Sequence, residues 1–540
     1  MRIKLKGVNK MGYTIGVSSG IFRAASEEQK GEYVGLPHKA MFSMFKGVMF
    51  TQLDLETLSE FKEPELDKRM EEVRKMGIKY GLHGEVPEYS SAFPKLDTAL
   101  FDEWRRSHER FIEEIKGTIK VKAVYLLFHA ATSDSFLVLW REFQSLKVCD
   151  IWGRLMRKFL EEHDDLLEWA ITKEFITSIV DRRGTLDMER MKEYARRELL
   201  QAQLDEGKKQ EELKKPTEAE IKEKALADAK KEFMSILSTD DFTYGTERVA
   251  YYIIAKWMRD GGKGCPPELH TLWKDIAGDG DIEEEKFRNK FEKWTPAVTA
   301  AYHWGHIYPE KCPTNLKDVE DPKPLLIKSG LKLVFESPMA GSGGEEAVRL
   351  ARPTHIYYMV KAINQPLVGM VVDAEHVLSA NINPMEDIKN LPFNAGEKIF
   401  VCHVGYPAPM APAHLPIPIG SEAHLYVYKL LWEMRKKGMK DSIIIFERGG
   451  GQEPVKESIL SLRLIAKYLE LDTPPDQLPE EFFGIPAGGP EITRQVVSVR
   501  EHALDPLKGL LTVPEEEYGF LGTAATAKGK AEEWAKRKLK

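Results

Sequence analysis

The chain has 540 residues, which is too long for one average domain but suits a large barrel that carries an insertion. Hydrophobic residues make up 42% of the sequence and aromatic residues 10%, so the chain can build a sizeable core and is not largely disordered. The net charge of −7 excludes a protein that attracts nucleic acid through its overall charge. Contact with a polyanion would need a local basic patch or metal ions.

The cysteines and the hydropathy indicate the cellular compartment. The cysteines are widely spaced and form no CxxC pair, which argues against a disulfide framework or a Cys-type zinc finger and fits a reducing cytosol. No run of 18 apolar residues occurs, and no apolar segment follows the basic N-terminus, so neither a membrane-spanning helix nor a secretory signal is expected. We expect a cytoplasmic protein with no membrane partner. The four cysteines are Cys149, Cys265, Cys312 and Cys402.

Short apolar runs near both ends of the chain predict strands. Most are continuous rather than alternating, as in parallel sheets that are buried on both faces. The predicted strands are Tyr13–Val17, Val48–Leu53, Ile78–Leu82, Ala123–Phe128, Leu331–Phe335, Leu367–Val372, Lys398–Cys402 and Ser442–Phe446.

Segments with helical periodicity alternate with these strands. They include Glu65–Met76, Phe101–Ile119, His355–Ile363, Ala423–Lys437 and Glu457–Leu469. Eight strands that alternate with helices predict an α/β fold of the (β/α)8 TIM barrel type. The alternative is an open doubly wound sheet, but no GxGxxG follows the first predicted strand.

The spacing of the strands breaks once, after the fourth. Residues 133–328 have a helical pattern, and the stretch from Asp181 to Asp240 is charged with both signs and poor in apolar residues, which predicts a long solvated helix or a helical hairpin. We interpret 133–328 as a helical insertion in one barrel loop; the alternative is a separate middle domain. The predicted division is therefore 1–132 and 329–485 for the two halves of the barrel, 133–328 for the insertion and 486–540 for a C-terminal extension that ends in a polar helix.

Ligand-type side chains stand where the predicted strands end. In a barrel the carboxyl ends of the strands surround one mouth, so these side chains are expected to converge there. The six are His83, His129, Glu336, Asp373, His403 and Glu447, and His376 follows Asp373 by three residues.

Crowded carboxylates and imidazoles require a shared cation, and mixed oxygen and nitrogen ligands without thiolate suit Zn²⁺ best, Mn²⁺ next and Ca²⁺ less well. Taken singly, a His after a strand is usually a satisfied loop or core residue, and an Asp or Glu there often caps the next helix. Six such residues at corresponding strand ends favour metal binding over these separate explanations.

Three segments resemble the endonuclease IV and xylose isomerase-like superfamily of metal-dependent TIM barrels, which includes the family 2 apurinic/apyrimidinic endonucleases. Phe335–Gly343, reading FESPMAGSG, is similar to the glutamate-led E-N-x-A-G-x-G segment of endonuclease IV, with one extra residue and with Ser337 in place of Asn. Ile15–Ala25 is similar to the family's opening strand and turn, and Asp373 to His376 has its D-x-x-H form. The resemblance covers about half the chain and leaves the insertion and the tail aside.

The resemblance implies a distribution of metal ligands. His83, His129 and Glu336 would hold one ion, and Glu336, Asp373, His403 and Glu447 a second. His376 and His414 would belong to a third, but Pro412 stands where the family has an Asp. Two ions are therefore expected, and the third is doubtful.

Two reactions and one non-enzymatic role follow as expectations. The first is metal-dependent hydrolysis of a phosphodiester in damaged DNA or another nucleic acid, with Glu336 and Glu447 as the catalytic carboxylates that bridge the ions or orient the water. The alternative is a sugar isomerase or epimerase, in which a single ion holds adjacent oxygens of a small sugar and His83 and His129 contact the substrate. The third is a metalloprotein without activity, whose charged insertion is an interaction arm.

Overall fold

The structure is a computed structural model of the full chain. It describes residues 12–20, 35–84, 97, 100–131, 148–180, 186–206, 213–237, 246–278, 280–288, 322–340, 345, 348–405, 416–447 and 453–485. The C-terminal extension 486–540, with its predicted helix, lies outside the described residues.

Eight parallel strands close into a barrel in chain order, from β1 beside β2 round to β8, which pairs with β1. This confirms the predicted (β/α)8 barrel and rules out the open sheet. The strands are β1 (Thr14–Ser18), β2 (Phe50–Asp54), β3 (Lys79–His83), β4 (Tyr125–His129), β5 (Lys332–Glu336), β6 (Val368–Asp373), β7 (Ile399–Val404) and β8 (Ile443–Phe446).

The apolar character of the strands explains the closure. All six residues of β6 and all four of β8 are buried, because helices cover the outside of the barrel and side chains fill its inside. One buried cluster, drawn from β2 and from β4 to β8, fills the interior, and its members are Phe50, Tyr125, Leu127, Val334, Val371, Val401, Ile443 and Ile445. Cys402 points the other way, with its sulfur 3.7 Å from the thioether of Met434 on a covering helix, and it is completely buried there.

The chain divides into two compact units. The barrel unit comprises Met1–Phe93, Phe111–Ser133 and Pro322–Lys540, and the helical unit comprises Pro94–Arg110 and Asp134–Asp321. The helix α4 (Phe101–Val121) contributes residues 101–110 to the helical unit and residues 111–121 to the barrel unit.

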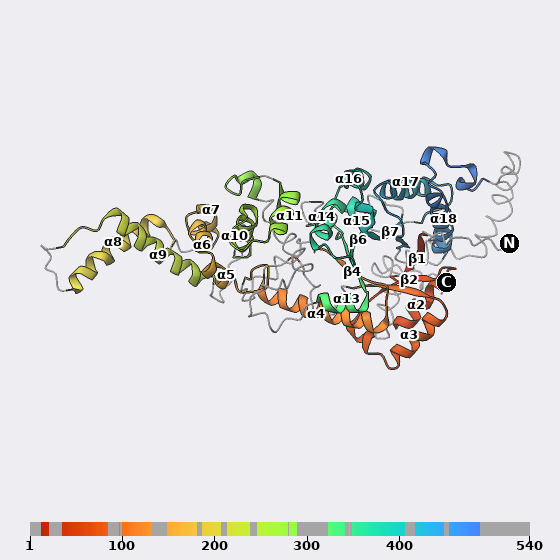
Figure 1. The fold of residues 1–540 in the computed structure, drawn as a ribbon, viewed down its shortest axis with the longest axis horizontal. Helices are drawn as coiled ribbons and strands as arrows, with labels where there is room; N and C mark the ends of the chain where they lie inside the picture. The colour runs from red at the N-terminus through yellow and green to blue at the C-terminus, as the bar shows by residue number, and fades with distance from the viewer. Residues whose placement is uncertain are drawn as a thin grey trace, which may run out of the picture. The chain divides into compact units, whose positions relative to one another are not determined.

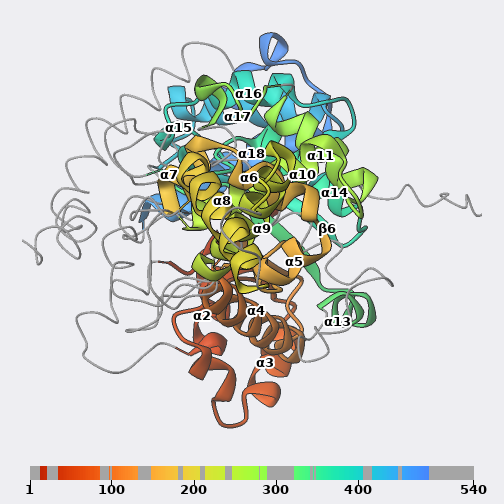
Figure 2. The ribbon, with the colours of Figure 1, turned by 90° about the vertical axis from the view of Figure 1, so that its left-hand side faces the viewer.

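Helices surround the strands of the barrel unit. Figure 2 shows α2 and α3 on one side of this unit and α16 and α17 on the other. The α-helices are α2 (Leu36–Phe45), α3 (Leu66–Lys75), α13 (Pro322–Ser329), α14 (Pro353–Ile363), α15 (Ala374–Ser379), α16 (Pro384–Asn390), α17 (Glu422–Lys436) and α18 (Glu453–Glu470). Short 3-10 helices are η1 (Leu58–Lys62), η7 (Ala395–Lys398), η8 (Pro475–Gln477) and η9 (Glu480–Phe483).

The helical unit contains the predicted hairpin, formed by α8 and α9, which lie against each other (Figure 1). A small apolar seam of Ala195, Ile221 and Ala225 joins them, while their other faces carry the mixed charges. Thr217 caps α9 and exchanges hydrogen bonds with Glu220, directly after Pro216. The helices are α5 (Met156–Glu162), α6 (Asp164–Ile171), α7 (Glu174–Val180), α8 (Met188–Asp205), α9 (Glu218–Ile236), α10 (Thr246–Asp260) and α11 (Pro267–Ala277).

A search of the described helices for a membrane-spanning segment finds none with the required length and apolar character.

His424 on α17 is a fully buried histidine of the barrel unit. Its ring stacks on Phe482 with 4.2 Å between ring centroids, and its Nδ1 accepts a hydrogen bond from the backbone N–H of Gly420 at 3.2 Å. Burial lowers the pKa of His424 to about 4. The neutral ring is therefore the form that the fold stabilises.

We predict that His424 makes the barrel unit less stable in acid. Because its pKa is depressed in the folded chain, the stability it contributes is present above the unfolded pKa of about 6.5 and is lost as the pH falls toward 4. Between pH 7 and pH 4.5 this amounts to about 2 kcal/mol in the free energy of unfolding. Thermal unfolding of wild type and H424N across this range should show a shallower decline for the variant, with H38N at an exposed histidine as the control. Equal declines in wild type and H424N would contradict the assignment.

Candidate metal centre

The structure places the predicted ligand side chains at the ends of successive strands. His83, His129, Glu336 and Asp373 are the last residues of β3, β4, β5 and β6. His403 is the next-to-last residue of β7, and Glu447 follows the last residue of β8. Parallel strands present all these ends at one mouth of the barrel, so side chains hundreds of residues apart in sequence become neighbours.

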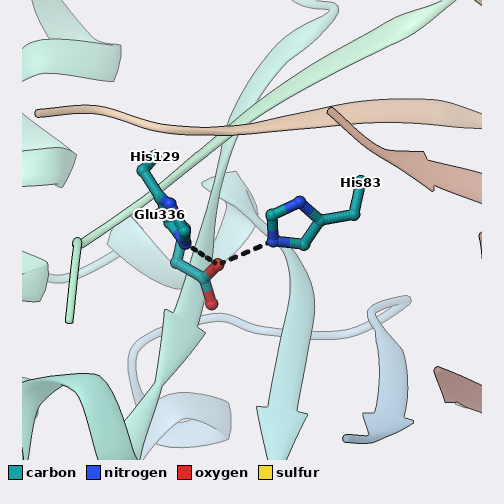
Figure 3. Close-up of side chains that lie close together, drawn as sticks. All are labelled: His83, His129 and Glu336. Atoms are coloured by element: carbon teal, nitrogen blue, oxygen red, sulfur yellow. Dashed lines mark ion pairs between the residues drawn. The ribbon is translucent and has the colours of Figure 1, made fainter. Parts of the chain in front are cut away.

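Two histidines and one glutamate form the first ligand group. The Nε2 atom of His129 lies 3.4 Å and the Nε2 atom of His83 lies 3.9 Å from the same oxygen, Oε2 of Glu336. Figure 3 shows the two rings approaching this carboxylate from different strands, and their centroids are 5.2 Å apart. The three ligand atoms lie within 4.8 Å of one another, which is compatible with a single ion among them.

The second ligand group surrounds His403. Its Nδ1 atom lies 2.7 Å from Oε1 of Glu336 and 3.5 Å from Oδ2 of Asp373. Oε2 of Glu447 lies 2.5 Å from the same nitrogen. Three carboxylates thus converge on one imidazole nitrogen, and the four ligand atoms again fall within 4.8 Å of one another.

Glu336 belongs to both groups through different oxygens. Oε2 faces His83 and His129, whereas Oε1 faces His403. The side chain is completely buried, so β5 and its surroundings fix the carboxylate between the two groups. A carboxylate held in this way has the geometry of a bridge between two cations.

The electrostatics of the centre require positive charge. Burial alone raises the pKa of Glu336, but the imidazoles of His403 and His376 outweigh it and hold that pKa well below its usual range. Burial alone lowers the pKa of His403, but Glu336 and Glu447 raise it well above the usual value. The carboxylates thus favour a cation at the Nδ1 side of His403, whether it is a proton or a metal ion.

The donor set fits divalent metal ions. Ligand atoms on a tetrahedral Zn²⁺ at bond lengths near 2.1 Å are about 3.4 Å apart. The contacts of 3.4 Å from His129 to Glu336 and of 3.5 Å from His403 to Asp373 match this spacing. The contacts of 2.5 and 2.7 Å around His403 are shorter and require those side chains to separate slightly. Imidazole and carboxylate ligands suit Zn²⁺ and Mn²⁺.

The proposed third site is not assembled in the described part of the chain. Nδ1 of His376 lies 2.9 Å from the carbonyl oxygen of Ser337, and its Nε2 is 3.9 Å from Oδ2 of Asp373. No third group of three metal-type ligands that includes His376 occurs among the described residues. His414 and Pro412 lie outside them.

Asp373 has two roles that the sequence analysis treated as alternatives. Its Oδ1 accepts hydrogen bonds from the backbone N–H groups of Glu375 and His376 at 2.7 and 3.0 Å and so caps α15. Its Oδ2 faces His403. The helix cap therefore orients the carboxylate toward the ligand group.

Two residues on β2 belong to the mouth and were missed by the sequence analysis. Asp54, the last residue of β2, is aligned with His83 in the sheet and accepts a hydrogen bond from Ser18 Oγ at 2.8 Å. Burial raises the pKa of Asp54, against a lowering by His83. Gln52 lies two residues earlier on the same side of the strand, and its Oε1 is 2.8 Å from Nε2 of His403. Asp54 directly follows a predicted strand, as the other candidates do, and this pattern was sufficient to find it.

Comparisons with known proteins were made for the whole chain. No family model matches it, and no curated protein does. Similar solved structures include a D-tagatose 3-epimerase-like protein, with 12% identity and a TM-score of 0.39 over 85% of this chain and 98% of that one. Another is an IolI protein with a bound zinc atom, with 10% identity and a TM-score of 0.36 over 85% and 98% of the two chains.

A third similar structure is a xylose isomerase-like TIM barrel fused to a 4-hydroxyphenylpyruvate dioxygenase. It has 9% identity and a TM-score of 0.38 over 88% of this chain and 45% of that one. None of these three proteins is named as an endonuclease. Likenesses this distant carry no argument about activity, and the fold itself rests on the closed strand order of this chain.

We predict that ligand substitutions remove metal ions group by group. Because Glu336 belongs to both groups, Glu336→Gln should reduce bound Zn²⁺ from about two ions per chain to less than one, whereas His83→Asn should leave about one. Elemental analysis after dialysis against trace Zn²⁺ measures both. Glu71→Gln, at an exposed glutamate of α3, is the matched control. Equal metal content in Glu336→Gln and the control would contradict the shared-ligand arrangement.

Proposed function

We propose that the chain is a metal-dependent enzyme that hydrolyses a phosphoester at the mouth of the barrel, using two divalent ions held by the two ligand groups. The observation that supports this proposal is the division of the Glu336 carboxylate, with one oxygen toward each group. A sugar enzyme with one ion needs only the second group. A two-ion centre requires two ligand groups and a carboxylate that faces both of them.

The exposure of the ligands gives the centre a closed side and an open side. The side chains of Glu336, Asp373 and His403 are completely buried, so they form the floor. His83, His129 and Glu447 remain 15%, 25% and 22% exposed. A substrate therefore approaches the centre past His83, His129 and Glu447. Glu336 belongs to the floor of the centre and holds the ligands in place.

Glu447 is the carboxylate that can exchange a proton with a water molecule beside the substrate, because it alone of the three acidic ligands reaches solvent. Ions bound in the two groups would polarise the phosphoryl oxygens and make water a stronger nucleophile. His83 and His129 would orient the substrate from the opposite edge of the opening.

The charge of the centre also favours an anionic substrate. Glu336, Asp373 and Glu447 contribute three negative charges, so two divalent ions leave a net charge of about +1, whereas one ion leaves about −1. Burial raises the pKa of Asp54, which favours its neutral form and limits its effect on this balance. A positive centre attracts a phosphoester, while a negative one suits a neutral sugar. The further prediction that the phosphoester belongs to damaged DNA rests on the sequence resemblance alone.

A second candidate function is a sugar isomerase or epimerase. It is favoured by the second ligand group, because Glu336, Asp373, His403 and Glu447 alone complete a four-ligand site for one ion. One of the similar structures is that of a D-tagatose 3-epimerase-like protein. In this case His83 and His129 would contact the hydroxyl groups of the sugar instead of a second ion.

We predict that metal content and reaction change together. Protein loaded with about two Zn²⁺ or Mn²⁺ ions should release product from phosphoesters, followed by ³¹P NMR in ¹⁸O-labelled water, and a chelator should abolish the release. Glu447→Gln should lower kcat at least about 100-fold while retaining one ion, because it removes both a ligand of the second ion and the carboxylate that exchanges a proton.

The substrate panel should contain a small phosphate monoester, a phosphodiester, duplex DNA with an abasic site and a set of ketoses. Hydrolysis of any phosphoester with two ions bound supports the first candidate. Conversion of a ketose with one ion bound, and no hydrolysis, supports the second and overturns the first.

A further inference from the structure

Gln52 is the middle residue of β2, and its polar side chain is completely buried. Because side chains alternate along a strand, Phe50, Gln52 and Asp54 lie on the same side of β2. Phe50 belongs to the apolar cluster that fills the barrel, and Asp54 stands at the end of the strand. Gln52 therefore lies in the layer between the apolar interior and the ligand groups.

The side-chain oxygen of Gln52 connects three strands. It lies 2.8 Å from the hydroxyl of Tyr125 on β4 and 2.8 Å from Nε2 of His403 on β7. An amide oxygen has two lone pairs, so these two contacts use its full capacity. Burial raises the pKa of Tyr125 strongly, so the hydroxyl keeps its hydrogen and donates it to Gln52.

This arrangement fixes the hydrogen on His403. Nε2 must donate to Gln52, so its hydrogen stays on that nitrogen, and Nδ1 faces the carboxylates of Glu336 and Glu447. A metal ion needs the lone pair of one ring nitrogen, and the hydrogen bond at the other nitrogen decides which one is available. Gln52 thus presents Nδ1 to the centre and prevents the ring from turning.

The barrel is shaped to allow this contact. A methyl group added at Gly81, which is aligned with Gln52 on the neighbouring strand β3, would meet the Tyr125 ring at 2.2 Å. The glycine therefore leaves the space in which the ring lies, and the ring carries the hydroxyl to Gln52. The Nε2 atom of Gln52 is buried and makes no hydrogen bond within the part of the chain that the structure describes. Leaving such a group unsatisfied costs about 1–3 kcal/mol, which a residue selected for stability alone would avoid.

We infer that Gln52 is a positioning residue that sets the orientation and the protonated nitrogen of His403, with Tyr125 holding the amide in place. The inference rests on the proposed function, because the orientation of the ring serves to present Nδ1 of His403 to the second metal ion. Outer-shell partners of this kind change metal affinity by about 10- to 100-fold.

Two substitutions at one position separate hydrogen bonding from packing. Gln52→Met keeps the length of the side chain but removes the acceptor, so the affinity for Zn²⁺, measured by competition with a chromogenic chelator, should fall about 10- to 100-fold at one of the two sites. Gln52→Glu keeps an acceptor and should retain the affinity. Tyr125→Phe should give a smaller loss, and Tyr80→Phe, which removes a buried hydroxyl bonded to the carbonyl of Val121, is its matched control.

NMR of the histidine rings provides a readout that packing does not affect. In protein labelled with ¹⁵N-histidine, the Nε2–H signal of His403, assigned by its absence in His403→Asn, should be protected from exchange in wild type and Gln52→Glu and lost in Gln52→Met. An unchanged signal together with unchanged Zn²⁺ affinity in Gln52→Met would overturn the inference. If wild type binds no divalent ion, the proposed function fails, but the NMR comparison on metal-free protein still decides the role of Gln52. If Gln52→Met does not fold, Tyr125→Phe decides by the same signal.

Discussion

The structure depends on the compensation of negative charge at the mouth of a closed parallel barrel. Closure brings Glu336, Asp373 and Glu447 together around Nδ1 of His403, with one carboxylate oxygen of each 2.5 to 3.5 Å from that nitrogen. Carboxylates that converge in this way repel one another unless a positive charge lies among them. The barrel that assembles the site therefore also needs the site to be occupied by a cation, and stability and chemistry share one requirement.

Exposure divides the ligands by what they can do. Four ligands are the last residues of their strands, yet His83 and His129 keep some exposure whereas Glu336 and Asp373 are completely buried. His403 lies one residue inside the end of β7 and is completely buried, and it contacts Gln52 beneath it. The packing around each strand end, and not the position on the strand alone, therefore separates the exposed ligands from those that form the floor.

Much of this arrangement could be predicted from the sequence, because continuous apolar runs reveal buried parallel strands and a polar residue at the end of each run is easy to see. Seven of the eight predicted strands end one or two residues too early, in most cases because a histidine or carboxylate interrupts the apolar pattern although the backbone continues to pair. Asp54 stands directly after a predicted strand like the other candidates, so the pattern was sufficient to find it. Gln52 could not be predicted at all, because a single amide within an apolar run gives no sign of its partners, and those partners come from β4 and β7. Which oxygen of Glu336 faces which ligand group depends on a side-chain rotamer that packing sets. A sequence pattern carries no information about that rotamer.

In the helical unit, the sequence pattern predicts the structure but indicates no function. Its hairpin follows from local signals, a Thr217 cap after Pro216 and a narrow seam of small residues, so its form is easily predicted. These signals indicate no reactive site. The charged side chains of α8 and α9 pair largely within the hairpin, as Arg196 does with Glu218 and Lys224 does with Glu198. The chemistry of the chain is therefore concentrated where the strands end. There Glu336, Asp373 and His403 are completely buried polar side chains, and a bound cation and the hydrogen bonds of Gln52 stabilise this burial.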